Sequence, residues 1–211
     1  DFAYIVYSER SQQGWITPAE NHAVNTLTCV NLSDGGERWK FTTPLLKTLI
    51  FPRLYTSTDG SRLIMQAHQI GWGQPEKFTL FSLDAKGQTQ GSWSTGSAPQ
   101  SLIIASSTGR VAMACGDRLL EMRDANGAFI WNIRWPDQPC TVAFASDDKG
   151  LYVSDDAGNV SLLDAQGKLL WTKPVGGIVR LTSRGDALYA AGWDGRLRKI
   201  DPQGNITWSI N

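Results

Sequence analysis

Residues 151–171 read LYVSDDAGNVSLLDAQGKLLW, and residues 188–208 read LYAAGWDGRLRKIDPQGNITW. The two stretches have equal length and align without a gap. Each contains short runs of alternating apolar and polar residues separated by Gly, Asp and Asn, which is typical of β-strands joined by tight turns. The duplication predicts a fold built from a repeated β unit, because self-similarity at a fixed period marks repeat architectures.

The signature Asp-x-x-Gly-x-x-x-Trp marks this unit along the chain. Full copies consist of Asp124, Gly127 and Trp131; Asp164, Gly167 and Trp171; and Asp201, Gly204 and Trp208. Looser copies surround Gly87, where Trp93 comes two places late, and Gly35, where Trp39 is in register. The predicted units are residues 1–43, 44–96, 97–135, 136–175 and 176–211.

Each unit contains four short strand signals, seen best in CTVAFASD, LYVSD, NVSLLD and KLLWTKP of the fourth unit. Four strands in a repeat of about 40 residues is the pattern of a β-propeller blade. A two-sheet sandwich also has regular short strands, but it gives no reason for Gly and Trp to recur at one position in every unit. We therefore expect an all-β protein, a β-propeller of four-stranded blades with five units visible.

The repeated residues have physical roles in such a blade. The glycines, such as Gly167, open a turn that needs positive φ, and the aspartates, such as Asp164, accept hydrogen bonds from the turn amides. Trp39, Trp131, Trp171 and Trp208 lie on outer strands and offer a flat face to the next blade. Because they recur in nearly every unit, we interpret them as packing residues and not as ligand platforms.

The fourth unit resembles the repeat of the pyrroloquinoline-quinone-like (PQQ-like) β-propeller family. The matching residues are Asp155, Gly158, Leu163, Asp164, Gly167, Lys168 and Trp171. The resemblance is strong in the last two units, fair in the third and weak in the first two. It implies that each tryptophan stacks on a peptide plane of the neighbouring blade. It does not fix a function, because the family includes both quinone dehydrogenases and proteins without a cofactor.

The first unit opens with AYIVYSE, which aligns with the second strand of the next unit and not with its first. One expectation is therefore a part of a seven- or eight-bladed ring, whose upstream blades lie on the same or another chain. The alternative is a ring of five blades with a three-stranded first blade.

The composition excludes several classes of function. Lys+Arg and Asp+Glu both number 20, so no basic surface for nucleic acid is indicated. No apolar run is long enough for a membrane span. The three cysteines, Cys29, Cys115 and Cys140, fit neither a disulfide framework nor a zinc site and are expected as free thiols in strands. With two isolated histidines and no adjacent cysteines, we expect no metal and no quinone cofactor.

Candidate binding residues lie on the turns between the second and third strands of a blade and between successive blades, which share one face. They are Trp15, His22, His68, Trp72, Trp135, Trp193 and Asp194. Aromatic and carboxylate side chains on one rim suit a protein or a glycan partner. The long loops 9–24 and 69–77 favour a site in the first two units.

The first hypothesis for function is a non-catalytic binding or scaffold module. The alternatives are a fragment of a propeller enzyme, either a quinoprotein dehydrogenase or a glycan-active enzyme, and a five-bladed lectin-like ring. The family resemblance favours the periplasm or the cell surface, whereas unpaired cysteines favour the cytoplasm.

Overall fold

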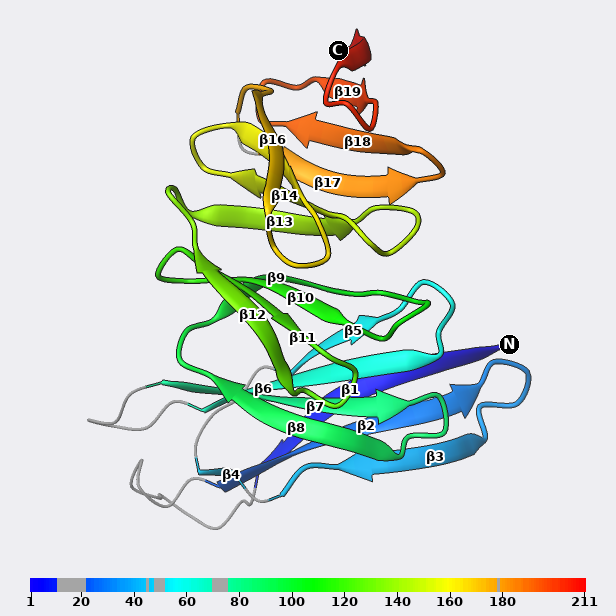
Figure 1. Ribbon diagram of the computed structural model, residues 1–211. Helices are drawn as coiled ribbons and strands as arrows, with labels where there is room; N and C mark the ends of the chain where they lie inside the picture. The colour runs from blue at the N-terminus through cyan, green and yellow to red at the C-terminus, as the bar shows by residue number, and fades with distance from the viewer. Residues whose placement is uncertain (11–21, 45, 48–51, 70–75, 178) are drawn as a thin grey trace. The chain divides into compact units, whose positions relative to one another are not determined.

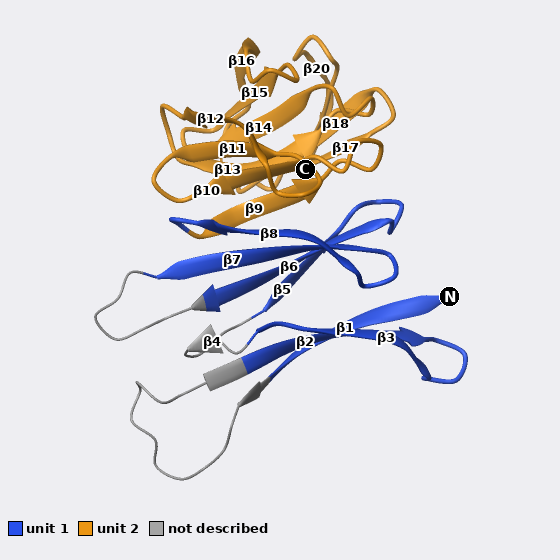
Figure 2. Cartoon of the chain, turned by 60° about the horizontal axis from the view of Figure 1, so that its bottom comes forward, with its two compact units in different colours: residues 1–97 blue, residues 98–211 orange. Residues whose placement is uncertain are grey.

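The computed structural model describes residues 1–10, 22–44, 46–47, 52–69, 76–177 and 179–211. The chain divides into two compact units, residues 1–97 and residues 98–211, shown in separate colours in Figure 2. All the secondary structure of the described residues is β-strand, which confirms the all-β prediction. No helix among the described residues is long and apolar enough to cross a membrane.

The first sheet of unit 1 is antiparallel and is ordered β1-β2-β3. Its strands are β1 (Phe2–Arg10), β2 (His22–Asn31) and β3 (Glu37–Thr42). The two-residue strand β4 (Leu46–Lys47) also pairs with β2, at His22 and Ala23. Because Ala23 already pairs with Arg10 of β1 on its other side, β4 continues the edge formed by β3.

The second sheet of unit 1 is a four-stranded antiparallel meander, ordered β5-β6-β7-β8. Its strands are β5 (Arg53–Thr56), β6 (Arg62–Gln69), β7 (Lys77–Asp84) and β8 (Thr89–Thr95). Leu27 of the first sheet and Leu63, Met65 and Leu83 of the second form one buried cluster. The apolar faces of the two sheets therefore make the core of unit 1.

Unit 2 contains three antiparallel four-stranded meanders, coloured from green to red in Figure 1. Sheet three consists of β9 (Pro99–Ile104), β10 (Val111–Cys115), β11 (Leu119–Arg123) and β12 (Phe129–Arg134). Sheet four consists of β13 (Pro139–Phe144), β14 (Leu151–Asp155), β15 (Asn159–Leu163) and β16 (Leu169–Pro174). Sheet five consists of β17 (Val179–Arg184), β18 (Ala187–Gly192), β19 (Leu197–Ile200) and β20 (Ile206–Ile210).

The first strands of these sheets lie side by side, because β13 contacts both β9 and β17. Two apolar layers fill the space between successive sheets. One layer joins Leu120 and Met122 of sheet three to Val153 of sheet four, and the other joins Leu162 of sheet four to Leu188 of sheet five. The middle strands are therefore buried on both faces, as in β14, where all five residues are buried. This arrangement is consistent with propeller blades; the total number of blades stays a prediction.

The turn between the third and fourth strands has one geometry in successive sheets. Asp164 accepts hydrogen bonds from the amides of Gln166 and Lys168 at 3.0 and 2.9 Å, and Gly167 closes the turn with φ of 81°. Asp84, Asp124 and Asp201 accept the same pair of bonds in their own turns. Gly127 and Gly204 also have positive φ.

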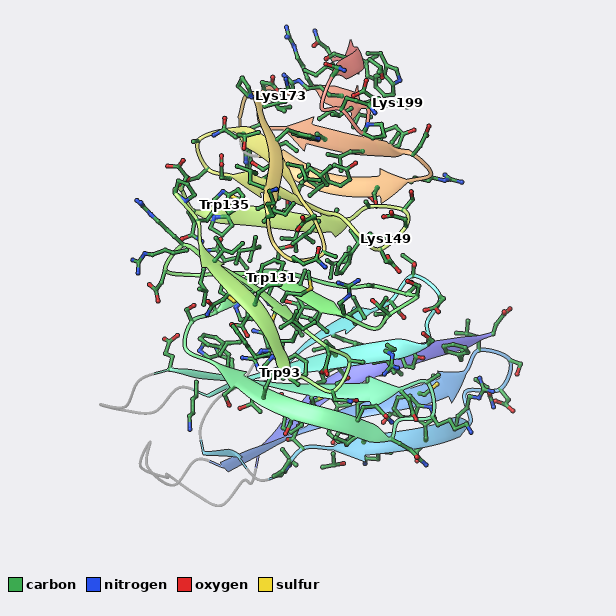
Figure 3. All side chains as sticks on the ribbon, in the orientation of Figure 1. Trp93, Trp131, Trp135, Lys149, Lys173 and Lys199 are labelled. Carbon is green, nitrogen blue, oxygen red and sulfur yellow. The ribbon has the colours of Figure 1, made fainter. Side chains whose placement is uncertain are left out.

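Within each unit, the turn of one sheet is also contacted by a tryptophan from the preceding sheet. The indole of that tryptophan lies against the glycine of the turn. Trp39 donates from Nε1 to the carbonyl of Ala85 at 3.0 Å, and Trp131 donates to that of Ala165 at 3.1 Å (Figure 3). A Cβ on Gly167 would lie 3.0 Å from Trp131 Cδ2, so only glycine admits the ring this closely. Trp208 of the last strand is 39% exposed and packs on Tyr189 of its own sheet.

Candidate functional site

A pocket of about 510 Å³ opens where the first strands of unit 2 begin. It is lined by Gln100, Cys140, Thr141, Arg180, Ala191, Gly192 and Trp193. These residues come from the starts of β9, β13 and β17, from the end of β18 and, for Trp193, from the turn directly after β18. The pocket, called here the inner-strand pocket, therefore lies on the face that carries the turns between sheets and the turns between second and third strands.

Trp193 and Arg180 are two exposed side chains of this pocket, and Gln100 is a third. Trp193 is 82% exposed, the most exposed of the large apolar side chains described. Arg180 is also exposed and forms no hydrogen bond or salt bridge with another described residue. Trp and Arg are enriched among the residues that dominate binding energy in protein interfaces. The pair can thus supply a flat apolar surface and an available positive charge to one ligand.

The turn that carries Trp193 is fixed by an ion pair directly after it. Asp194 receives hydrogen bonds from both terminal nitrogens of the Arg198 guanidinium, one of them at 3.2 Å, and from the Arg196 amide at 3.2 Å. Arg198 is only 5% exposed, so its charge depends on this partner. The hydrogen bond from Arg198 holds the pKa of Asp194 at about 2, well below its ordinary value. The same bond raises the pKa of Arg198.

Gly192 makes room for this ion pair. A Cβ at this position would lie 2.6 Å from Oδ1 of Asp194 and 3.3 Å from the Arg198 guanidinium. In sheet four the equivalent position holds Asp155, whose carboxylate accepts hydrogen bonds from the Asn159 amide and the Trp135 indole. Where sheet four has a buried aspartate, sheet five therefore has a glycine with an ion pair next to it.

Trp135, named above as a binding candidate, lies in the core. It is 7% exposed, belongs to the apolar layer between sheets three and four, and donates from Nε1 to Asp155 at 3.4 Å (Figure 3). Its position in the turn between two sheets suggested an exposed residue on the rim. The indole is instead buried, where it donates a hydrogen bond to the carboxylate of Asp155 in the next sheet. We do not retain Trp135 as a binding residue.

The candidates of unit 1 are divided between described and undescribed residues. His68 of β6 stacks on Phe78 at 4.2 Å, and its Nε2 lies 3.1 Å from the Glu76 carboxylate, so its ring is held by the hairpin β6–β7. His22 begins β2, where only its main chain is described. Trp15 and Trp72 lie outside the described residues, as does most of loops 9–24 and 69–77. Their role stays a prediction.

Cys140 lies half-buried in the inner-strand pocket, whereas Cys29 and Cys115 are buried in β2 and β10. All three thiols are free. Burial raises the pKa of Cys140, and the carboxylates of Asp156 and Asp155 raise it further. Burial raises the pKa of Cys115 to about 12. Such thiols are poor nucleophiles, since the thiolate is the reactive form.

The sequence interpretation missed Arg180, Cys140 and Gln100. The available signal was the alignment of the first strands of the units. In that register Arg180 stands where β9 and β13 carry Ser101 and Thr141. The other two sheets of unit 2 have a small hydroxyl residue at this position, so the charged Arg180 was a signal in the sequence for the pocket. Among the described residues, no group of three or more His, Cys, Asp or Glu side chains is arranged to hold a metal ion.

Comparison with known proteins supports the repeat assignment. Residues 117–211 match the family model described as outer membrane protein assembly factor BamB. These are PQQ-like repeats. The match covers a little under half of the chain and includes sheets four and five, where the PQQ-like resemblance is strongest. A comparison with curated protein sequences gave no significant match.

Three solved structures share the fold of this chain at low sequence identity. BamB from Moraxella catarrhalis superposes with a TM-score of 0.62 and 17% identity over 99% of this chain and 67% of that one. Sqt1 from Saccharomyces cerevisiae superposes with a TM-score of 0.65 and 14% identity over 89% of this chain and 58% of that one. A protein of unknown function from Bacteroides caccae gives a TM-score of 0.56 and 17% identity over 90% of this chain and 77% of that one.

Proposed function

We propose that this chain is a non-catalytic PQQ-like module that binds a protein partner at the inner-strand pocket. The observation that carries the proposal is the exposed Trp193 beside Arg180 at the mouth of a pocket built from three sheets. The ion pair between Asp194 and Arg198 fixes the turn that holds Trp193, so little conformational freedom of that turn is lost on binding. An exposed indole on a fixed turn is the kind of anchor that dominates protein interfaces.

The family match supports a protein as the partner. The matched family is described as an outer membrane protein assembly factor. Assembly of proteins requires contact with them, so this description fits a protein partner. That description also supports a location outside the cytoplasm, in the periplasm or at the cell surface. A glycan is the alternative ligand, since an exposed Trp with neighbouring Gln100 and Arg180 also suits a sugar ring.

The larger ring is a further part of the proposal. We place the five sheets within a propeller of seven or eight blades, supported by the 67% and 58% of the lengths of BamB and Sqt1 that the chain spans. The three sheets of unit 2 carry the inner-strand pocket by themselves, so the binding proposal does not depend on the blade number.

Quantitative affinity capture from an extract of the source organism tests the proposal. The wild-type protein, Trp193→Ala and Arg180→Ala serve as baits, and the affinity of each recovered partner is then measured with purified components. We expect each substitution to weaken binding by about tenfold or more, the effect of losing a hot-spot side chain.

Leu169→Ala is the matched control, because Leu169 is 51% exposed but lies on the outer strand β16, away from the pocket. It should leave binding unchanged. A protein partner that binds Trp193→Ala and wild type equally, or a bound glycan in place of a protein, would overturn the proposal.

A further inference from the structure

A second pocket, of about 590 Å³, lies between sheets four and five at the turns from first to second and from third to fourth strands. Tyr152, Leu162 and Leu170 line it from sheet four, and Ala187 and Pro202 line it from sheet five. We call it the turn pocket. It shares no residue with the inner-strand pocket, and the inference drawn from it does not rest on the function proposed above.

The turn pocket exists because one turn of sheet five is short. In sheet four Phe144 pairs with Leu151, which leaves residues 145–150, six in number, to form the turn. In sheet five the equivalent pair is Ser183 and Leu188, and only four residues, 184–187, lie between them; of these, Arg184 and Ala187 still pair with each other. The last sheet therefore has two residues fewer at the place where the preceding sheet has a longer turn.

The longer turn of sheet four closes the equivalent space against sheet three. Asp148, with φ of 54°, accepts a hydrogen bond from the Ser107 amide at 2.8 Å. Its carbonyl accepts a second bond from the Arg110 guanidinium at 3.4 Å. Among the described residues no such bond joins residues 184–187 to residues 145–150; sheets four and five are joined one step deeper, where the Ser183 hydroxyl donates to the Phe144 carbonyl. The space between the two turns, on the outer side of that bond, is the turn pocket.

The inside of the turn pocket is apolar, and its rim is acidic. Tyr152 and Leu162 are 4% and 9% exposed, and Leu170 continues the apolar surface outward at 55% exposure. Asp147, Asp164 and Asp186 line the pocket against a single cation, Lys149, which Figure 3 shows beside the turn after β13. A ligand that matches both features has an apolar stem and a positively charged end.

Tyr152 adds a polar group that a ligand can satisfy. Its ring packs on Trp171 in a tilted arrangement, with ring centroids 6.0 Å apart, and its hydroxyl forms no hydrogen bond with another described residue. Because Tyr152 lines the pocket, a donor or acceptor of the ligand that reaches this hydroxyl can form a hydrogen bond that stabilises the bound state.

We propose that the turn pocket binds an arginine side chain of a partner polypeptide. The methylene stem lies along Tyr152 and Leu162, as such stems do on apolar surfaces, and the guanidinium reaches the carboxylates of Asp147 and Asp186. The exposed Leu170 provides apolar surface for a residue next to the arginine, which favours a polypeptide over a free cation.

The test uses the isotopically labelled chain and two peptides, acetyl-Ala-Leu-Arg-Ala-amide and the same peptide with citrulline, which keeps the shape but lacks the charge. We expect the arginine peptide to shift the amide signals of residues 145–150 and 185–187 in nuclear magnetic resonance spectra. The citrulline peptide should need at least about fivefold more ligand for the same shift. Added salt should weaken the arginine peptide only, because the rim charges are screened.

Two variants make the test specific. Asp147→Asn combined with Asp186→Asn should abolish the preference for arginine over citrulline, whereas Asp137→Asn, on the opposite turns, should preserve it. Insertion of two residues between Gly185 and Asp186, which restores the longer turn, should abolish the shifts while the remaining spectrum stays that of the folded protein. Equal binding of both peptides, shifts located elsewhere, or unchanged binding to the inserted variant would each overturn the proposal.

Discussion

The indole nitrogen of Trp171 donates a hydrogen bond of 2.9 Å to the main-chain carbonyl of Pro202 in the next sheet. The ring lies against the glycine of the same turn, since a Cβ on Gly204 would be 3.1 Å from Trp171 Cδ2. Trp171 also contacts the apolar layer between sheets four and five. One side chain thus joins the outer strand of one sheet to a turn of the next.

Replacement of Trp171 by alanine should destabilise unit 2 by about 3 kcal/mol, the loss that follows removal of a large packed aromatic side chain. Urea unfolding followed by circular dichroism measures it. Trp193→Ala is the matched control, and its loss should be within about 0.5 kcal/mol because that ring is exposed. Similar small losses in both variants would remove the packing role of Trp171.

Gly204 lies under the Trp171 indole, and both its positive φ and the closeness of the ring favour glycine there. A pair of substitutions separates these two effects. Gly204 and Gly195 both have positive φ, of 84° and 77°, but a Cβ on Gly195 meets nothing within 4 Å. Gly195→Ala should therefore cost only the backbone strain, about 1–2 kcal/mol. Gly204→Ala should cost clearly more in the same urea titration, because Trp171 must also move. Equal losses would show that the indole contact adds nothing.

The regular part of this structure could be predicted from the sequence because it repeats. Strands such as β13 and β15 follow from period-2 alternation between turn residues, and five sheets follow from five copies of the signature. The short β4 lay beyond such reasoning, since it depends on an irregular edge next to β2.

The inner-strand pocket was harder to foresee because its residues lie on strands that are distant in sequence. Trp193 was identified as a candidate from its position in a turn. Arg180 becomes a candidate only because the fold brings it into the same pocket as Trp193. Trp135 shows the opposite error. Its turn position suggested exposure, but Asp155 from the following sheet holds the indole in the core. Single-chain patterns do not report such contacts between sheets.

The ion pair between Asp194 and Arg198 makes one contribution to stability dependent on pH. The pKa of Asp194 is lowered from 3.8 to about 2 in the folded protein, so the folded state favours the charged carboxylate. This contribution is fully present above pH 3.8 and is lost as the pH falls toward 2.

Melting temperatures of the wild type and Asp194→Asn test this dependence. The wild type should melt higher by a constant margin from neutral pH down to about pH 5, and the margin should shrink between about pH 4 and pH 2. Asp137→Asn, whose carboxylate makes no salt bridge with a described residue, should show no such change. A margin that stays the same at every pH would contradict the ion-pair role.

The three free thiols should react in an order set by exposure. Cys140 faces the inner-strand pocket, whereas Cys29 and Cys115 are 2% and 0% exposed. Iodoacetamide at mildly alkaline pH, followed by mass spectrometry of the peptides, should therefore label Cys140 first, and the other two only after unfolding. Faster labelling of Cys115 in the folded protein would contradict the burial of β10. A partner that fills the pocket should slow the labelling of Cys140.

The central claim is that a protein partner contacts Trp193 at the inner-strand pocket. Photo-crosslinking tests it most directly, with a photoreactive phenylalanine analogue placed at position 193 and, in a separate variant, at position 208, where the native Trp is 39% exposed on β20. Illumination in the presence of the captured partner should give a covalent adduct from position 193 and much less from position 208. Adducts from position 208 alone, or from neither position while the partner remains bound, would contradict the claim.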